Sequence, residues 1–343
     1  MEQTMITIVM GVFNEEKHLT SCIESILSQT FADFKLIISD NYSTDKTALI
    51  IDNYIEKDSR ISKISPKYHC PSIEHGKFIL EELVPKLDTK YCIFIGGHDI
   101  WDSNYLKILF MRAESSSDIS VVYGEGFEID YYSSKILSKY EDHVIVAEIF
   151  KPLVPHVMLL SLRMCLVMYG LIRRDNLCSI QVRHLCAGYD HFMATELALL
   201  GKVLHEPAAK LYLRQSKDHG SLEAYATRHL HRGTTNSAHQ DFFKQIDWLL
   251  YLSNKAILLN ESNSDFYSQA PIRNMLEISL LYGYIVRYLP NLNMLDPNGI
   301  QTFLNRPDMV NLYEANSSLV EFVKQLVVDG LIDQQENNLK LQQ

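Results

Sequence analysis

The sequence lacks the short motifs that mark several large enzyme classes. It contains no G-x-G-x-x-G and no G-x-x-x-x-G-K-[ST], which excludes the usual dinucleotide and P-loop phosphate sites. It also contains no G-x-S-x-G nucleophile elbow. The run His205-Glu206-Pro207 resembles a fragment of the zinc deaminases, but the paired cysteines that such a site needs do not follow it.

Paired cysteines and long apolar runs are also missing. None of the six cysteines forms a C-x-x-C pair, which predicts free thiols in a reducing compartment. No apolar run reaches the ~18 residues of a membrane span. The two longest runs, 156–172 and 275–289, are interrupted by charged residues and are predicted to be core helices. Because residues 1–4 are largely polar, we expect no secretory leader and a cytoplasmic location.

Basic residues are too few for a general nucleic-acid binder. The chain has 32 Lys and Arg against 42 Asp and Glu, a formal net charge of −10. Proteins that bind nucleic acid nonspecifically need a basic surface, so we expect no nucleic-acid partner. The 47% hydrophobic content is typical of a folded protein, and 343 residues suffice for one large domain and an appendage.

The pattern that is present alternates short apolar runs with amphipathic segments. Such alternation predicts an α/β fold with a mainly parallel sheet flanked by helices, over a domain of residues 1–223. Residues 224–343 are predicted to form a helical extension. Strands are expected at 6–13, 34–39, 61–65, 91–95, 119–123 and 202–205, the last closed by Pro207, and helices at 46–56, 74–87, 105–114 and 188–200, with another after a cap at Asn14.

Polar clusters follow three of these strands, at Asn14, at 40–45 and at 96–99. In open parallel sheets, ligands bind beyond the carboxyl ends of the strands. We therefore expect the clusters to meet in one crevice, in which Asp40, Asp99 and Asp190 share a cavity.

The segments around these clusters resemble one enzyme family. Residues 9–16 read VMGVFNEE, residues 19–34 read LTSCIESILSQTFADF, and residues 40–47 read DNYSTDKT. In order and spacing they resemble the opening of the family 2 glycosyltransferases, which have the GT-A fold. FIGGHDIWD at 94–102 is similar to the family's F-L-D-x-D-D-x-W segment, and YGLIR at 169–173 to its Y-G-x-x-R segment. The resemblance covers residues 5–220.

The resemblance implies nucleotide contacts at the ends of the first two strands, at Val12, Phe13, Asn14, Asp40 and Asn41. A carboxylate or amide there can accept hydrogen bonds from a base or from ribose hydroxyls. The alternative for Asp40 is that, with Ser43, it closes a turn and caps the next helix.

The resemblance also places donor phosphates, and a bridging Mn²⁺ or Mg²⁺, at His98 and Asp99, with His219 as a third ligand. Here the sequence departs from the family, because Gly96 and His98 replace two carboxylates. The alternative is that His98 binds phosphate directly and that no stable metal site exists. Arg214 is a further candidate phosphate contact, with a surface salt bridge as its alternative.

Asp190, at the start of a predicted helix, is the candidate general base. In the relatives that the sequence resembles, a carboxylate at this position takes the acceptor proton during direct displacement. The alternative is a simple helix cap.

The sequence thus predicts an inverting glycosyltransferase for polysaccharide biosynthesis. The donor would be a nucleoside diphosphate sugar, with UDP-sugar favoured, and the acceptor a saccharide or a lipid-linked saccharide. The competing hypothesis is a noncatalytic GT-A-like module that binds nucleotide or carbohydrate. The apolar C-terminal helices are candidates for a homodimer contact or for peripheral contact with the inner membrane face.

Overall fold

The computed structural model describes residues 4–141, 146, 151–161, 165–180, 189–215, 248–249 and 251–259. The chain divides into two compact units, Met1–Glu148 with Ser161–Arg232, and Ile149–Leu160 with Gly233–Gln343. In the second unit, residues 248–249 and 251–258 are helical. No helix among the described residues is both long and apolar enough to cross a membrane. The predicted division between residues 223 and 224 lies outside the described residues and stays a prediction.

One mixed sheet forms the framework of the first unit. Its strand order is β3-β2-β1-β4-β8-β6-β9-β5, and β7 pairs with β6 outside this path. The strands in the described residues are β1 (Thr4–Val12), β2 (Phe34–Asp40), β3 (Ile61–Ile64), β4 (Thr89–Gly96), β5 (Ile100–Trp101), β6 (Ile119–Asp130), β7 (Ile136–Lys139), β8 (Leu171–Arg173) and β9 (Lys202–Gln215).

Most of the helices follow the predicted alternation, but the single core helix predicted at 156–172 is wrong, because Leu166–Tyr169 is a 3-10 turn and 171–172 belong to β8. Helix α3 continues through a π-helical turn (Ile79–Leu83) into a 3-10 turn (Val84–Lys86), where Pro85 ends regular helix. Two further 3-10 turns cover Lys151–Leu153 and Leu166–Tyr169. The α-helices are α1 (Leu19–Leu27), α2 (Thr47–Ile55), α3 (Ser72–Phe78), α4 (Tyr105–Ala113), α5 (Val154–Ser161), α6 (Arg174–Cys178) and α7 (Tyr189–Leu200).

The parallel half of the sheet lines up the strand ends. Strand β1 pairs in parallel with β2 and β4, and β2 pairs in parallel with β3. In this register Gly11 lies beside Gly96, and Val12 lies beside Asp40. The loops after β1, β2 and β4 therefore leave the sheet at the same edge, as the topology predicted.

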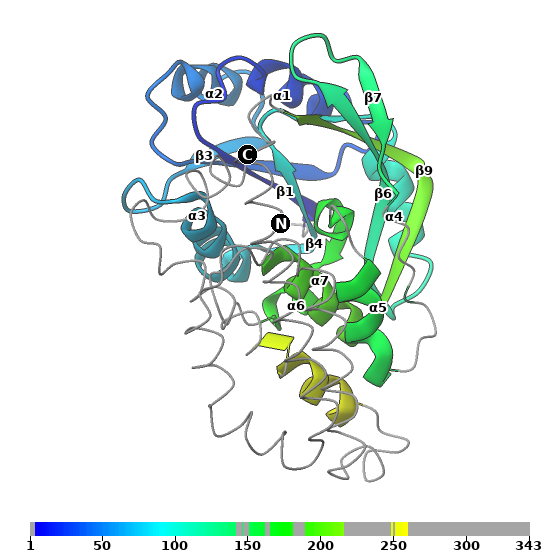
Figure 1. Ribbon diagram of the computed structural model, residues 1–343. Helices are drawn as coiled ribbons and strands as arrows, with labels where there is room; N and C mark the ends of the chain where they lie inside the picture. Colours follow the sequence, from blue (N-terminus) through cyan, green and yellow to red (C-terminus); the bar gives the residue numbers. More distant parts are fainter. Residues whose placement is uncertain are drawn as a thin grey trace, which may run out of the picture. The chain divides into compact units, whose positions relative to one another are not determined.

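Helices cover both faces of this parallel half. In Figure 1, α1 and α2 lie together on one side of β1 and β3, and α3 lies on the other. The apolar stripe Leu19, Cys22, Ile23 and Ile26 buries α1 on the sheet. The Cys22 thiol also donates a hydrogen bond to the carbonyl of Gly96 (3.3 Å), which ties α1 to the end of β4.

The predicted end of β9 is wrong. The strand does not stop before Pro207 but continues to Gln215. Its pairing with β6 jumps from Gly124 opposite Glu206 to Glu125 opposite Lys210, so residues 207–209 bulge out of the ladder. Proline cannot donate a ladder hydrogen bond and is tolerated at such a bulge. Because β9 continues past Pro207, Arg214 lies close to the residues that follow β4.

Candidate functional site

The loops after β1 and β2 are clamped to each other. Asn14 is not the predicted helix cap, because α1 begins at Leu19 and Asn14 has a left-handed backbone with φ 56°. Its side-chain oxygen instead accepts the backbone N–H of Thr44 (2.8 Å). Three successive backbone N–H groups also donate into the second loop, from Asn14 to Ser43, from Glu15 to Thr47 and from Glu16 to Asp45.

Asp40 closes the turn after β2. Its Oδ1 accepts the backbone N–H (3.0 Å) and the hydroxyl (2.6 Å) of Ser43, which is the alternative that the sequence left open. The carboxylate is buried at the end of the strand beside Val12. This bonding fixes its orientation, and nucleotide contact by Asp40 stays a prediction.

The side chain of Asn41 is occupied by the protein itself. Its Nδ2 donates to the carbonyl of Cys70 (2.6 Å), and its Oδ1 accepts the backbone N–H of the same residue (3.1 Å). Its own backbone N–H donates to Val12 (3.0 Å), and the residue is only 3% exposed. Asn41 therefore joins the end of β1, the end of β2 and the segment at Cys70. Direct contact of its amide with a nucleotide stays a prediction, and these hydrogen bonds do not favour it.

An exposed aromatic side chain lies at the same edge. Phe13 directly follows β1 and is 43% exposed, and its ring lies 4.6 Å from that of His69. The Nδ1 atom of His69 is 2.9 Å from the carbonyl oxygen of Asn41, which holds the imidazole in place. A supported, exposed ring of this kind can stack on a nucleobase. His69 carries no motif signal and was missed in the sequence.

His98 and Asp99 lie together, as predicted, but inside a charged network. His98 Nδ1 is 2.9 Å from a carboxylate oxygen of Glu15, and Nε2 is 3.8 Å from Oδ1 of Asp99. Asp99 is 2% exposed, and its Oδ1 accepts the backbone N–H of Arg214 (2.9 Å).

Arg214 is a buried structural residue rather than a surface salt bridge. Its guanidinium donates to the carbonyls of His98 (3.0 Å), Asp130 (3.1 Å) and Tyr131 (3.2 Å). Burial lowers the pKa of Arg214, and the neighbouring carboxylates of Asp99 and Asp130 oppose that shift.

As they lie here, His98 and Asp99 do not fit a divalent ion. Burial by itself lowers the pKa of His98, but Asp99 and Glu15 outweigh it and raise the pKa to about 9. The imidazole is therefore protonated at neutral pH and has no free lone pair for a metal. His219 lies outside the described residues. A metal at this segment stays a prediction that would require His98 to lose its proton and turn from Glu15.

The protonation of His98 predicts a pH-dependent stability. The pKa rises from about 6.5 in an unfolded chain to about 9 in the fold. The stabilisation is therefore complete below the unfolded value and is lost as the pH rises through the folded value. We expect the free energy of unfolding in urea to fall over this range, and less steeply in His98→Gln. His69→Gln is the control and should keep the wild-type slope. Equal slopes in His98→Gln and wild type would contradict the ion pairs.

Gly96 packs closely against the side chain of Asp99. A Cβ atom at this position would lie 2.8 Å from Oδ2 of Asp99 and 3.4 Å from the imidazole of His98. A larger residue here would therefore require the Asp99 carboxylate to move, while His98 would stay in ordinary contact.

A cavity of about 420 Å³ lies against β1 and β4. Its walls come from both strands, from 72–80, from the turn before β8 and from the start of α7, and they are largely apolar. Gly11, Gly96, Tyr169 and Asp190 line it, whereas Asp40 and Asp99 do not. The expectation that all three aspartates share this cavity is therefore wrong. The register places Asp40 one residue beyond the strand positions that line it.

Tyr169 lies within the electrostatic influence of two of the predicted carboxylates. Burial raises its pKa strongly, and the charges of Asp99 and Asp190 raise it further. The phenol therefore stays protonated and can act only as a neutral hydrogen-bonding group. Asp99 thus lies close behind the cavity wall, although it does not form part of it.

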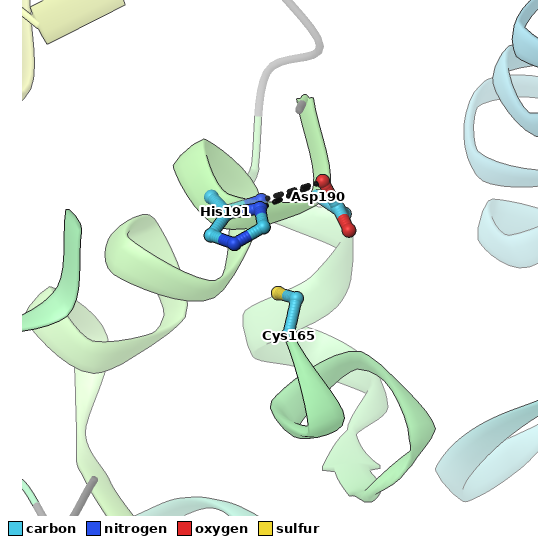
Figure 2. Close-up of side chains that lie close together, drawn as sticks. All are labelled: Cys165, Asp190 and His191. Carbon is cyan, nitrogen blue, oxygen red and sulfur yellow. Dashed lines mark hydrogen bonds and ion pairs between the residues drawn. The ribbon is translucent and has the colours of Figure 1, made fainter. Parts of the chain in front are cut away.

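Asp190 is the second residue of α7 and is 39% exposed. Its Oδ1 accepts the backbone N–H of His191 (3.0 Å) and lies 3.1 Å from His191 Nδ1. Figure 2 shows this contact and places the sulfur of Cys165 facing the pair. The carboxylate thus bonds the start of its helix and lines the cavity at the same time. Neither His191 nor Cys165 belonged to the motifs used in the sequence.

Comparison with known proteins identifies the family that the site resembles. The model of the glycosyl transferase family 2 matches residues 7–69. GlyG of Streptococcus pneumoniae serotype 4, a glycosyltransferase, is 25% identical over 126 residues, which are 37% of this chain and 40% of GlyG. WfgD of Escherichia coli, a UDP-Glc:alpha-D-GlcNAc-diphosphoundecaprenol beta-1,3-glucosyltransferase, is 26% identical over 124 residues, which are 36% of this chain and 46% of WfgD.

Among solved structures, S. aureus TarS 1–349 in complex with UDP has the same fold. The TM-score is 0.60 at 14% identity, over 95% of this chain and 89% of that one. The chain spans under half the length of the two curated relatives above. The resemblance to family 2 glycosyltransferases and the predicted GT-A fold are confirmed.

Proposed function

We propose, on the premise of the family 2 match and the GT-A fold, that the chain is an inverting glycosyltransferase. The donor would be a nucleoside diphosphate sugar, and the acceptor a saccharide or lipid-linked saccharide in polysaccharide biosynthesis. The observation that carries the proposal is the matched segment 7–69, whose first strand forms part of the wall of a cavity that Asp190 also lines. With this function we propose a cytoplasmic location.

The donor base would stack on Phe13, with the Asp40 carboxylate accepting from its imide or from the ribose. UDP is favoured because TarS has been crystallised with UDP and with UDP-GlcNAc, and because WfgD is named for UDP-Glc. His98, with a 32% exposed side chain, would supply positive charge toward the departing diphosphate. Burial lowers the pKa of His98, but Asp99 and Glu15 outweigh it and raise the pKa to about 9, which favours the charged imidazole at neutral pH.

Asp190 would act as the base in a direct displacement. It lines the cavity beside the end of β4, where the donor's anomeric carbon is expected. As the acceptor hydroxyl attacks, its proton passes to Asp190, and the sugar–phosphate bond breaks on the opposite face. A single displacement of this kind inverts the anomeric configuration.

One observation favours a noncatalytic binding module as the second candidate. Gly96 and the buried, hydrogen-bonded Asp99 remove the open carboxylates that the family's segment would offer. Transfer assays with a donor panel, each with and without Mn²⁺, separate the two functions. Turnover with one donor supports the enzyme, and nucleotide binding without transfer or hydrolysis would support the module.

Nucleotide binding should stabilise the fold in a way that depends on Phe13. At a hundredfold excess over Kd, UDP should add about 2.7 kcal/mol to the free energy of unfolding. Phe13→Ala removes the stacking surface, and loss of base–aromatic stacking weakens binding by roughly 1–3 kcal/mol. The thermal shift with UDP should therefore shrink in Phe13→Ala. Met111→Ala, which changes a more exposed apolar side chain on α4 (64% against 43% for Phe13), is the control. Equal shifts in both variants would refute base stacking on Phe13.

The C-terminal extension belongs to the same proposal. We retain the division into a GT-A domain over 1–223 and a helical extension over 224–343. The extension would contact a second subunit or the membrane face that carries a lipid-linked acceptor. Sedimentation of the full chain and flotation with anionic vesicles test these two roles.

A further inference from the structure

A second cluster of chemically active side chains lies at the wall of the cavity. Cys165, Asp190 and His191 each offer one metal-ligand atom, and these atoms lie within 4.8 Å of one another. Among the described residues, these three side chains form the group that is arranged closely enough to hold a metal ion. Figure 2 shows the sulfur of Cys165 facing the histidine and the aspartate, which come from the start of α7.

The three side chains are held from two separate segments. Cys165 is buried, and its backbone is left-handed, with φ 53° and ψ 43°. This conformation is uncommon for a residue with a Cβ and costs on the order of 1–3 kcal/mol, so the surrounding structure must enforce it. His191 is fixed by its bond to Asp190 (3.1 Å). The three ligand atoms thus already lie close together in the structure.

The ligand types select the ion. A thiolate, an imidazole and a carboxylate suit Zn²⁺ and similar transition metals, whereas Mg²⁺ prefers oxygen ligands alone. Tetrahedral bonds of about 2.0–2.3 Å to Zn²⁺ place ligand atoms roughly 3.3–3.8 Å apart. The cluster, whose ligand atoms lie within 4.8 Å of one another, therefore needs to contract by at most about 1.5 Å. Because Asp190 also lines the cavity, a fourth coordination position would open toward bound substrate or water.

We infer that Cys165, Asp190 and His191 form a binding site for a Zn²⁺-type ion. This site is separate from the one that the family resemblance placed at His98 and Asp99. Binding would release the thiol proton of Cys165 and engage the lone pairs of Asp190. The carboxylate that is proposed to accept the acceptor's proton would then be coordinated, so the ion would inhibit transfer. Only this consequence for turnover rests on the proposed function.

Metal binding to the full chain tests the inference without any need for turnover. Chelator-treated protein is titrated with Co²⁺, which reports thiolate ligation by a charge-transfer band in the near ultraviolet, and then with competing Zn²⁺. We expect one ion per chain with this band. Cys165→Ser should abolish the band and weaken Zn²⁺ binding at least about tenfold, and His191→Gln should weaken binding similarly. Cys178→Ser, which changes an exposed thiol, should leave both unchanged.

Urea unfolding of each variant shows whether that variant is folded. If Cys165→Ser does not fold, His191→Gln, which removes another proposed ligand, provides the test. The absence of a band in wild type, or an unchanged band in Cys165→Ser, would overturn the site. UDP-induced stabilisation, measured on the same samples without metal, reports separately on the proposed function. If transfer is found, Zn²⁺ should inhibit it and EDTA should restore it, while Cys165→Ser should resist the ion. Inhibition that persists in this variant would refute the assignment.

Discussion

Asp190→Asn should lower the rate of sugar transfer by about 10²–10⁴-fold, the usual contribution of a positioned base. The amide keeps the size of the side chain and can still accept the backbone N–H of His191, so the start of α7 should stay intact. It cannot take a proton from the acceptor hydroxyl. Initial rates at saturating donor and acceptor would measure the loss. UDP-induced thermal stabilisation should remain, because Asp190 lies beside the expected sugar and not beside the base.

Asp175→Asn is the matched control for this change. Asp175 also lies in the first turn of a helix, but its side chain is 85% exposed and outside the cavity. Its variant should transfer sugar at the wild-type rate. Turnover that survives in Asp190→Asn would remove this carboxylate from the mechanism and leave it as a helix cap.

The second large effect should appear in stability rather than in catalysis. Asn41→Ala leaves the buried carbonyl and N–H of Cys70 without their partners. Each unsatisfied group costs about 1–3 kcal/mol, so we expect a marked fall in the free energy of unfolding in urea. Asn41→Asp keeps the acceptor for the N–H and should lose less.

Asn53→Ala, on the exposed face of α2, provides the baseline for an asparagine that joins no buried groups. Its free energy of unfolding should stay close to that of wild type. If Asn41→Ala were equally stable but bound UDP more weakly, the amide would contact nucleotide after all. Nucleotide contact by Asn41, which the family resemblance implies, would then be supported, although the hydrogen bonds of its amide to Cys70 do not favour it.

The parallel half of the fold could be predicted because its signals are local. The apolar runs at 6–13 and 34–39 are long enough for buried strands, and the stripe from Leu19 to Ile26 repeats with the helical period. The half of the sheet that contains β6 and β9 could not be predicted in the same way. Strand β9 continues past Pro207 through a bulge in its parallel pairing with β6, and pairing with a distant strand leaves no trace in the local sequence.

The sequence supplied candidate residues for the site but not their contacts. The motifs located His98, Asp99 and Asp190, since their spacing follows the family. They could not show that Glu15 would pair with His98, or that Arg214 would arrive from the far end of β9 to bond Asp99. These contacts decide the charge of His98, and they depend on tertiary packing. Cys165 escaped notice for the same reason, because its partners on α7 lie more than twenty residues away.

The packing at Gly96 restricts how this segment can change. A Cβ atom at position 96 would lie 2.8 Å from Oδ2 of Asp99, so Gly96→Asp requires that carboxylate to move. A histidine at 98 without Glu15 would lose a charge partner. Positions 15, 96, 98 and 99 are therefore coupled, and a change at one of them should be tolerated better when its neighbours change with it.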